Sequence, residues 1–228
     1  MTMPEGWSIR PVTPDDADAF ARCHAEAVAL TYAHIMPPEF GDSRLAEIGE
    51  AADRLRHQFA VEVLDRAEGR VPHRTHWVGV DDHGAVVAIA SVGPGRDPWD
   101  LAMGHPDPPI SYNLDQIYLL PRAQGTGLAQ HLLDVILPNG LGAWLWILRD
   151  NPRAEAFYRR NGFVDEPYET TCGDLWFHKP MFRMWRPDAV HTDAVHTDPV
   201  PTDAPPPDTE DYDQSQRPVP DAKAGDQR

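Results

Sequence analysis

The fold is decided by residues 112–137, which read YNLDQIYLLPRAQGTGLAQHLLDVIL. Residues 112–120 have the composition of a strand, and residues 125–137 place their apolar side chains at the three-and-four spacing of one helix face. The segment Gln-Gly-Thr-Gly-Leu-Ala at 124–129 joins the two. Its glycines leave backbone N–H groups free to approach a ligand at the positive end of the helix. The sequence therefore predicts a strand, a glycine turn and a helix in succession, and the turn either cradles an anion or is a tight connection that binds nothing.

The segments that follow continue the alternation of strand and helix. Ala143 to Leu148 is almost wholly apolar, as expected for a central strand covered on both faces. Asn151-Pro152 caps a further helix, which Gly162 ends. No Walker-type Lys follows the glycine turn, and the acid that a dinucleotide fold places about 20 residues later is missing. Both of these nucleotide-binding folds are therefore disfavoured.

The chain ahead of this region alternates helices with short strands. A strand at 7–12 leads into a helix that begins at residues 13–16 and fades near Tyr32. A second helix, capped by Ser43, carries an apolar stripe from Leu45 to Val63. The other expected elements are a hairpin of strands 77–80 and 85–92 turned at 81–84, an irregular binding loop at 93–110, and a closing hairpin of 175–177 with 182–185. This order predicts an α/β fold with a mixed, mostly antiparallel central sheet and helices on both faces.

Composition separates one folded unit from a tail. The chain has 228 residues, 41% of them hydrophobic, and a formal net charge of −16. Residues 188–228 lack Leu, Ile, Phe, Met, Trp and Cys and carry ten acidic but three basic residues, so they cannot build a core. We therefore expect a folded domain at 1–187 and an acidic, Pro-rich, disordered tail at 188–228.

Several functional classes are excluded by charge, cysteine usage and hydropathy. Clustered Lys and Arg, which track nucleic-acid phosphates, are missing, so we expect no nucleic-acid partner. Cys23 and Cys172 are too few for a disulfide framework and lack the spacing of metal ligands, so we expect no metal. No stretch of about 18 apolar residues occurs and the start lacks a signal-peptide pattern, which predicts a cytoplasmic protein without a membrane partner.

Two motifs resemble those of a known family. The pattern Gln124-x-x-Gly127-x-Ala129 resembles the Gln/Arg-x-x-Gly-x-Gly/Ala signature of the GCN5-related N-acetyltransferases (GNAT). Asn151-x-x-Ala154-x-x-Phe157-Tyr158-x-x-x-Gly162-Phe163 resembles the strand–helix element that follows it in that family. The resemblance covers about residues 7–186 and implies a GNAT-like sheet whose fourth and fifth strands splay apart.

The resemblance implies where acetyl-CoA, a co-substrate, would bind. The pantetheine arm would lie between the splayed strands and pair with main-chain groups there, much as an added strand would. The pyrophosphate would reach the glycine turn, and Asn151 would contact the pantetheine or fix the start of its helix. The implied cofactor-binding residues are Ile117, Tyr118, Leu119, Gln124, Gly125, Thr126, Gly127, Leu128, Ala129 and Asn151.

The resemblance makes Tyr158 the general acid, and the chemistry of the residue agrees. Aminolysis of a thioester expels a thiolate, and a nearby phenol O–H can hydrogen-bond to it or protonate it. The alternative is that Tyr158 and Phe157 are core aromatics. Asp115 is the best candidate for the base that deprotonates the amine, since it stands where the family often has Glu. Its alternative is a structural hydrogen-bond acceptor.

The acceptor is the least determined part of the site. Asp97, Asp100 and Asp107 of the irregular loop could attract a cation, and Trp99 with Tyr32 could form aromatic walls. We expect transfer of an acetyl group to a primary amine of a small molecule by direct attack on the thioester. The alternatives are acetylation of a protein N-terminus or lysine, and a non-catalytic acyl-CoA-binding interaction module. A homodimer is left open.

Overall fold

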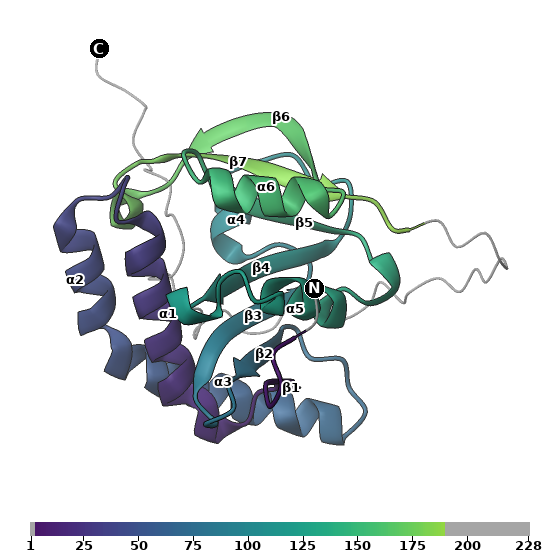
Figure 1. Ribbon diagram of the computed structural model, residues 1–228. Coiled ribbons are helices and arrows are strands. Elements are labelled where there is room, and N and C mark those ends of the chain that lie inside the picture. The colour runs from purple at the N-terminus through teal and green to yellow at the C-terminus, as the bar shows by residue number, and fades with distance from the viewer. Residues whose placement is uncertain (1–2, 190–228) are drawn as a thin grey trace, which may run out of the picture.

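The structure is a computed structural model that describes residues 3–189. Seven strands and six helices follow one another in the order that Figure 1 shows. They are β1 (Ser8–Pro11), α1 (Ala17–Tyr32), α2 (Pro38–Ala46), α3 (Ile48–Ala67), β2 (Thr75–Val80), β3 (Val86–Pro94), α4 (Pro98–Ala102), β4 (Tyr112–Leu119), α5 (Leu128–Ile136), β5 (Ala143–Leu148), α6 (Pro152–Arg160), β6 (Val164–Thr171) and β7 (Pro180–Arg186).

All seven strands form one sheet in the order β1-β2-β3-β4-β5-β7-β6. Every neighbouring pair is antiparallel except β4 and β5, which are parallel. That parallel pair is joined at a single position, Asn113 opposite Trp144, and the two strands separate beyond it. The predicted fold class is therefore confirmed: the sheet is mixed and mostly antiparallel, with the fourth and fifth strands splayed apart.

Helices cover both faces of this sheet. Ile117 and Leu119 of β4 pack with a core cluster that includes α5 and α6, whereas Tyr118 between them packs with a cluster built by α1 and α3. Because alternate side chains of a strand point to opposite faces, the two helix pairs lie on opposite sides of the sheet. Figure 1 shows α5 and α6 in front of the strands and α1 beside α2 at the edge of the molecule.

The second predicted helix is in fact two helices. α2 begins at Pro38, directly after the extended residue Pro37, and α3 begins at Ile48. Proline suits the first turn of a helix, because its missing N–H has no partner to lose there. Ser43 therefore lies inside α2 instead of capping a helix, and its Oγ donates to Phe40 O at 2.9 Å. The predicted stripe is buried at Ala52, Leu55 and Phe59 but exposed at its ends, Leu45 and Val63.

The predicted closing hairpin is wrong in its first strand. Residues 174–176 form a 3₁₀ turn, and the strand that precedes β7 and pairs with it is β6. The sequence of β6 does not indicate a strand, because it is polar and contains Pro167. Proline is tolerated there because β6 is an edge strand whose pairing with β7 shifts register between Asp165 and Glu169.

Other boundaries follow the local sequence. The hairpin turned at 81–84 is confirmed, with Asp81 N donating to Ala85 O at 3.0 Å. The irregular loop at 93–110 contains the short helix α4. The predicted tail lies outside the described residues except for Asp188 and Ala189, so the boundary near residue 187 stays a prediction. Within residues 3–189, no helix combines the length and hydropathy needed to cross a bilayer.

Candidate active site

A β-bulge in β4 builds one wall of the candidate site. Ser91 of β3 lies opposite Gln116 and Val92 lies opposite Leu114, so Asp115 is an extra residue in the register of β4. A bulge of this kind re-aims a side chain. Asp115 and Gln116 are neighbours in the chain, yet both side chains reach Ser91 Oγ, at 2.7 Å and 3.1 Å. Both also line the pocket beside β4.

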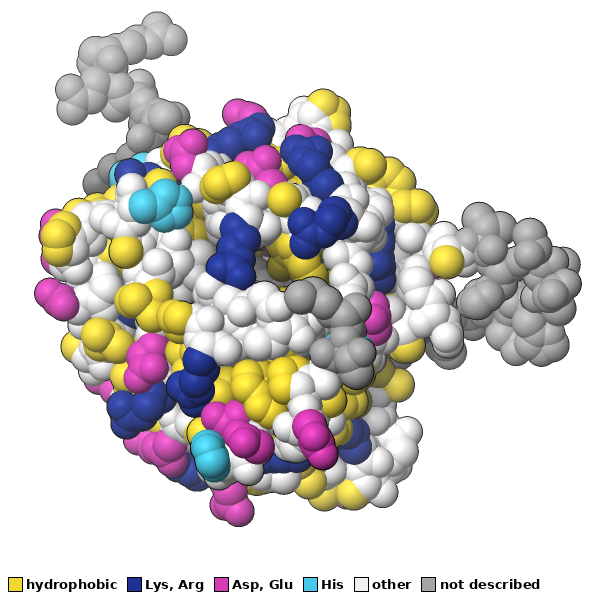
Figure 2. All heavy atoms as spheres, in the orientation of Figure 1, with side chains coloured by type: hydrophobic (Ala, Val, Ile, Leu, Met, Phe, Trp, Pro, Cys, Tyr) yellow, Lys and Arg dark blue, Asp and Glu magenta, His cyan; other side chains and the backbone are white. Residues whose placement is uncertain are grey.

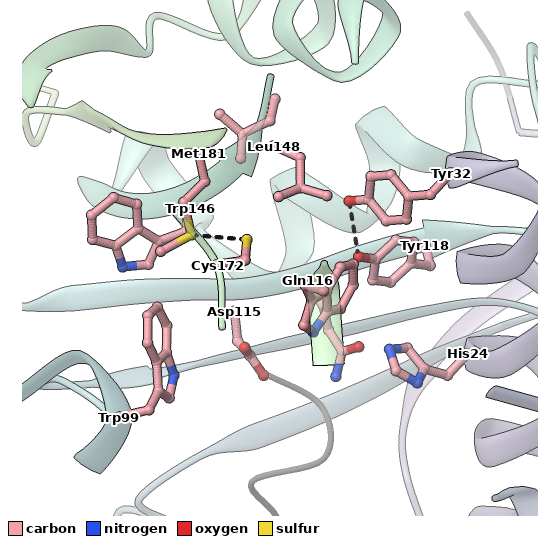
Figure 3. Close-up of a pocket in the computed structure, with 12 residues that line it drawn as sticks. His24, Tyr32, Trp99, Asp115, Gln116, Tyr118, Trp146, Leu148, Cys172 and Met181 are labelled. Carbon is pink, nitrogen blue, oxygen red and sulfur yellow. Dashed lines mark hydrogen bonds between the residues drawn. The ribbon is translucent and has the colours of Figure 1, made fainter. Parts of the chain in front are cut away.

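This pocket lies where β4 and β5 separate. Figure 3 shows Asp115, Gln116 and Tyr118 of β4 along one side and Trp146 and Leu148 of β5 along the other. α1 adds His24 and Tyr32, α4 adds Trp99, and the segment between β6 and β7 adds Cys172 and Trp176. The two aromatic residues expected at the acceptor, Tyr32 and Trp99, thus lie in the same pocket although 67 positions separate them in the sequence.

Two phenols, those of Tyr32 and Tyr118, meet in the pocket, whereas Tyr158 does not line it. The hydroxyl groups of Tyr32 and Tyr118 lie 3.3 Å apart on the α1 face of the sheet. Tyr158 of α6 belongs to the core cluster on the other face, where its ring contacts Phe157 and Phe163. Burial raises the pKa of Tyr158, and the nearby Tyr32 raises it further. Burial, Tyr32 and Tyr158 likewise raise the pKa of Tyr118, so all three groups remain protonated O–H donors at neutral pH.

Asp115 is held in place by two neighbours. Ser91 Oγ donates to Asp115 Oδ2 at 2.7 Å, and Arg74 Nη1 lies 3.4 Å from the same oxygen. The Asp115 side chain is 14% exposed, so it is accessible from the pocket while its position is fixed. The structure therefore brings together the predicted base, Asp115, and the wall residue Tyr118, while the predicted acid, Tyr158, packs in the core cluster on the other face and does not line the pocket.

The glycine turn has the geometry expected of an anion cradle. Gly125 and Gly127 have positive φ angles of 79° and 91°, which residues with a side chain rarely adopt. Gly127 is the residue before the first turn of α5. Leu128 N donates to Thr126 Oγ1 at 3.3 Å, whereas in the described part of the chain no acceptor is found for the N–H groups of Gly125, Gly127 and Ala129. These three donors are available to an anion at the start of α5.

The side chain of Gln124, a predicted cofactor-binding residue, is held by two hydrogen bonds. Its Nε2 donates to Leu119 O at 3.2 Å, and its Oε1 accepts a hydrogen bond from Arg153 of α6. The side chain thus ties the turn to the end of β4 and to α6, and it occupies one main-chain acceptor of the segment expected to pair with pantetheine. Asn151 caps α6 by accepting from Ala154 N at 3.3 Å, which is the second of the two roles expected for it.

A basic side chain lies at the turn even though the chain as a whole is acidic. Arg153 of α6 donates to Gln124, whereas Arg159 pairs with Asp165, and Figure 2 shows basic side chains around a hollow in this face of the molecule. Cationic side chains beside free backbone donors suit a phosphate-bearing ligand. Residues 117–119 provide the second part of the candidate binding surface. β3 pairs with one edge of β4 there, but β5 has already separated from the other edge, so that edge is open to a ligand.

The acidic loop residues are structural. Asp97 and Asp100 are buried, at 1% and 0% exposure, and neither lines the pocket. Arg74 Nη2 donates to Asp97 Oδ1 at 2.6 Å. Asp100 pairs with Arg96 and accepts from Trp146 Nε1 at 3.1 Å. Asp107 is exposed and pairs with Arg96 at 2.9 Å. These contacts fix the loop and leave Asp97 and Asp100 no role at an acceptor.

The sequence patterns did not predict several of the residues that line the pocket. Trp146 and Leu148 read as core residues of β5, and Trp176 was expected in a strand. Cys172 lines the pocket, but burial raises the pKa of its thiol to about 12, so it stays protonated and is a poor nucleophile. Among residues 3–189, no three His, Cys, Asp or Glu side chains come together as a metal site.

Comparison with known proteins agrees with this geometry. Residues 72–165 match the family model described as an acetyltransferase (GNAT) domain. The match contains the bulge at Asp115, the glycine turn and Tyr158, and it confirms the family resemblance over these residues. No curated protein matches the sequence of this chain.

Solved structures share the fold at low sequence identity. The PaiA N-acetyltransferase of Thermoplasma acidophilum in complex with coenzyme A has a TM-score of 0.55 at 18% identity, covering 79% of this chain and 98% of its own. An acetyltransferase of Corynebacterium glutamicum described as histone acetyltransferase HPA2 and related has 0.51 at 22%, covering 82% and 99%. The spermidine N-acetyltransferase of Vibrio cholerae in complex with CoA and spermine has 0.50 at 16%, covering 80% and 95%. The chain thus has the fold of the N-acetyltransferases.

Proposed function

We propose that the protein is an acetyl-CoA-dependent N-acetyltransferase that acetylates the primary amine of a small molecule. The observation that carries the proposal is the split between β4 and β5. It leaves the edge of β4 unpaired, with the glycine turn beyond one end and a pocket that contains Asp115 on one face. An extended, amide-bearing ligand can complete such an edge, and its phosphates can bind at the start of α5.

The residues of the chain fit the groups of acetyl-CoA. Main-chain groups at Ile117 and Tyr118 would pair with the pantetheine amides, while Leu119 O is engaged by Gln124. The N–H groups of Gly125, Gly127 and Ala129 would hold the pyrophosphate. Thr126 and Leu128 would contribute by shaping the turn, since Thr126 Oγ1 donates to Ala123 O at 2.7 Å and accepts from Leu128 N.

When bound, acetyl-CoA supplies the thioester carbonyl that the amine attacks. Asp115 would accept a proton from the ammonium group, so that the nitrogen lone pair can form the new C–N bond. Tyr158 would donate its phenolic proton, or a hydrogen bond, to the sulfur as the C–S bond breaks, and the second proton that the nitrogen loses once the C–N bond has formed would restore the phenol. Because burial raises the pKa of Tyr158, this phenol stays protonated while it waits for the thiolate.

The two neighbours bound to coenzyme A support the co-substrate, and the neighbour bound to spermine supports a small amine as acceptor. The neighbour described as a histone acetyltransferase represents the alternative of protein acetylation. The non-catalytic alternative predicts binding of acetyl-CoA without turnover. The cytoplasmic location and the homodimer stay predictions.

The test is incubation of the full chain with acetyl-CoA and a panel of small amines and Lys-containing peptides, with products identified by mass spectrometry. We expect N-acetylated small amines and an equal amount of free coenzyme A. Acetylation confined to peptides would establish the protein-directed alternative. Tight binding of acetyl-CoA with no acetylated product from any acceptor would establish the non-catalytic one.

A further inference from the structure

Five aromatic side chains form much of the wall of the pocket between β4 and β5. Tyr32, Trp99, Tyr118, Trp146 and Trp176 all line it. Figure 3 shows Trp99 and Trp146 near one end of the pocket and Tyr32 and Tyr118 near the other. Trp99 and Trp176 are 5% and 6% exposed, so each ring is packed in a fixed position. Rigid rings of this kind offer flat apolar surface and faces that attract a cation.

The same wall carries little negative charge. Among the described residues that line the pocket, Asp115 is the one acid, and its Oδ2 already lies 3.4 Å from Arg74 and accepts from Ser91. The other polar members are neutral or basic, namely His24 and Gln116 with the two tyrosines. The nearby acids Asp97 and Asp100 are buried in their own pairs with Arg74 and Arg96 and contribute no free charge to the pocket.

This combination limits the number of charges that an acceptor can carry. A polyamine brings several ammonium groups. Each ammonium that enters the pocket loses water, and this costs free energy unless a carboxylate pairs with it. One ammonium can be held by the aromatic faces and can transfer its proton to Asp115. A second ammonium has no carboxylate of its own. An apolar or aromatic body, in contrast, gains contact area against the five rings.

From this wall we infer that the acceptor is a primary monoamine attached to an apolar or aromatic body, not a polyamine. The inference rests on the proposed function and names its substrate class. The body would stack against Trp99 and Trp146, and the amine nitrogen would point toward Asp115 and the split, where the thioester would lie. The pocket thereby selects by shape and by charge count at once.

The test compares two primary amines of similar length and different charge, 2-phenylethylamine and 1,5-diaminopentane, with spermidine as a third acceptor. Initial rates with acetyl-CoA give kcat/KM for each. We expect the arylalkylamine to exceed both polyamines at least about tenfold, the range that one matched or mismatched contact produces. A kcat/KM for either polyamine equal to or above that of the arylalkylamine overturns the inference and leaves the proposed function standing.

A variant of the wall tests whether the number of carboxylates in the pocket sets the preference for a monoamine. Gln116→Glu adds a second carboxylate beside Asp115 with almost no change in shape, and it should move the preference toward 1,5-diaminopentane by about tenfold. Asp107→Asn, which alters an exposed acid outside the pocket, is the matched control and should leave the preference unchanged. An unchanged preference in a folded Gln116→Glu enzyme contradicts the inference. If no amine is acetylated by the wild-type protein, the proposed function fails, and the inference fails with it.

Discussion

The phenolic oxygens of Tyr32 and Tyr118 lie 3.3 Å apart, although 86 positions separate the two residues in the sequence. The contact joins the end of α1 to the strand that borders the split. It also brings two protonated phenols close to Tyr158, whose pKa is raised by burial and by Tyr32. The centre of the proposed site is therefore a group of neutral O–H donors, and Asp115 is the one carboxylate among the described residues of the pocket wall.

The Tyr32–Tyr118 contact should have a measurable coupling energy. Urea unfolding of Tyr32→Phe, Tyr118→Phe and the double variant forms a cycle that isolates the hydrogen bond from the packing of the rings. We expect a coupling of about 0.5–1.5 kcal/mol, the net contribution of a typical hydrogen bond. Additive effects of the two substitutions would mean that the hydroxyls do not interact in solution.

Replacing Gly127 should weaken the binding of acetyl-CoA. Gly127 has a φ of 91°, and a β-branched side chain there strains the backbone and covers the N–H groups at the start of α5. Calorimetry with Gly127→Val should show a loss of affinity of at least about tenfold. Gly69→Val is the matched control, because Gly69 also has a positive φ, of 72°, but lies in open space after α3. Equal affinities of the two variants would remove the turn from the binding site.

Stability should fall as the pH falls below about 6.5, the usual pKa of histidine. Burial lowers the pKa of His76, against the opposing hydrogen bond to Glu62 at 2.8 Å. The unfolded chain therefore binds a proton at a higher pH than the folded protein, and the free energy of unfolding decreases as the pH drops toward the folded pKa. Burial lowers the pKa of His73 and His105 as well, which adds to the effect.

A substitution assigns this pH dependence to its source. His76→Gln can still donate a hydrogen bond to Glu62 but cannot titrate, so urea unfolding between about pH 5 and pH 8 should show a shallower decline. His83→Gln changes a side chain that is 86% exposed and should keep the wild-type slope. A wild-type slope in His76→Gln would place the titrating group elsewhere.

Asp115 should matter most when the amine is protonated. Asp115→Asn keeps an acceptor for Ser91 but cannot take a proton, so kcat/KM should fall about 10²-fold or more near neutral pH. The deficit should shrink as the pH rises toward about 10, where amines lose the proton without help. A deficit that stays constant over this range indicates that Asp115 only supports the structure of the bulge.

Much of the fold follows from local patterns. The strand–turn–helix of residues 112–137 and the cap at Asn151 are encoded by neighbouring residues, and both are present in the structure. The break between α2 and α3 and the strand β6 were missed. Pro38 starts a helix that lacks a clear apolar stripe, and Pro167 argues against a strand unless the strand is known to be at an edge.

The site was predicted where it is local and missed where it depends on distant partners. Asp97 and Asp100 resemble cation-attracting residues until Arg74 and Arg96 are seen to neutralise them. The bulge that turns Asp115 toward the pocket depends on the register with β3, which no pattern within β4 reveals. Trp176 reaches the pocket from a turn that reads as a strand.

Single-turnover acetyl transfer by Tyr158→Phe at saturating acetyl-CoA tests whether Tyr158 is the general acid, because this measurement excludes product release from the comparison. The variant keeps the ring that packs on Phe157 and Phe163 and loses the proton donor. Tyr112→Phe serves as control, because Tyr112 precedes the position at which β4 is still paired with β5 and so lies outside the split. We expect unchanged affinity for acetyl-CoA with transfer slowed about 10²–10⁴-fold. A Tyr158→Phe rate equal to wild type across neutral pH would contradict this expectation and leave Tyr158 a core aromatic.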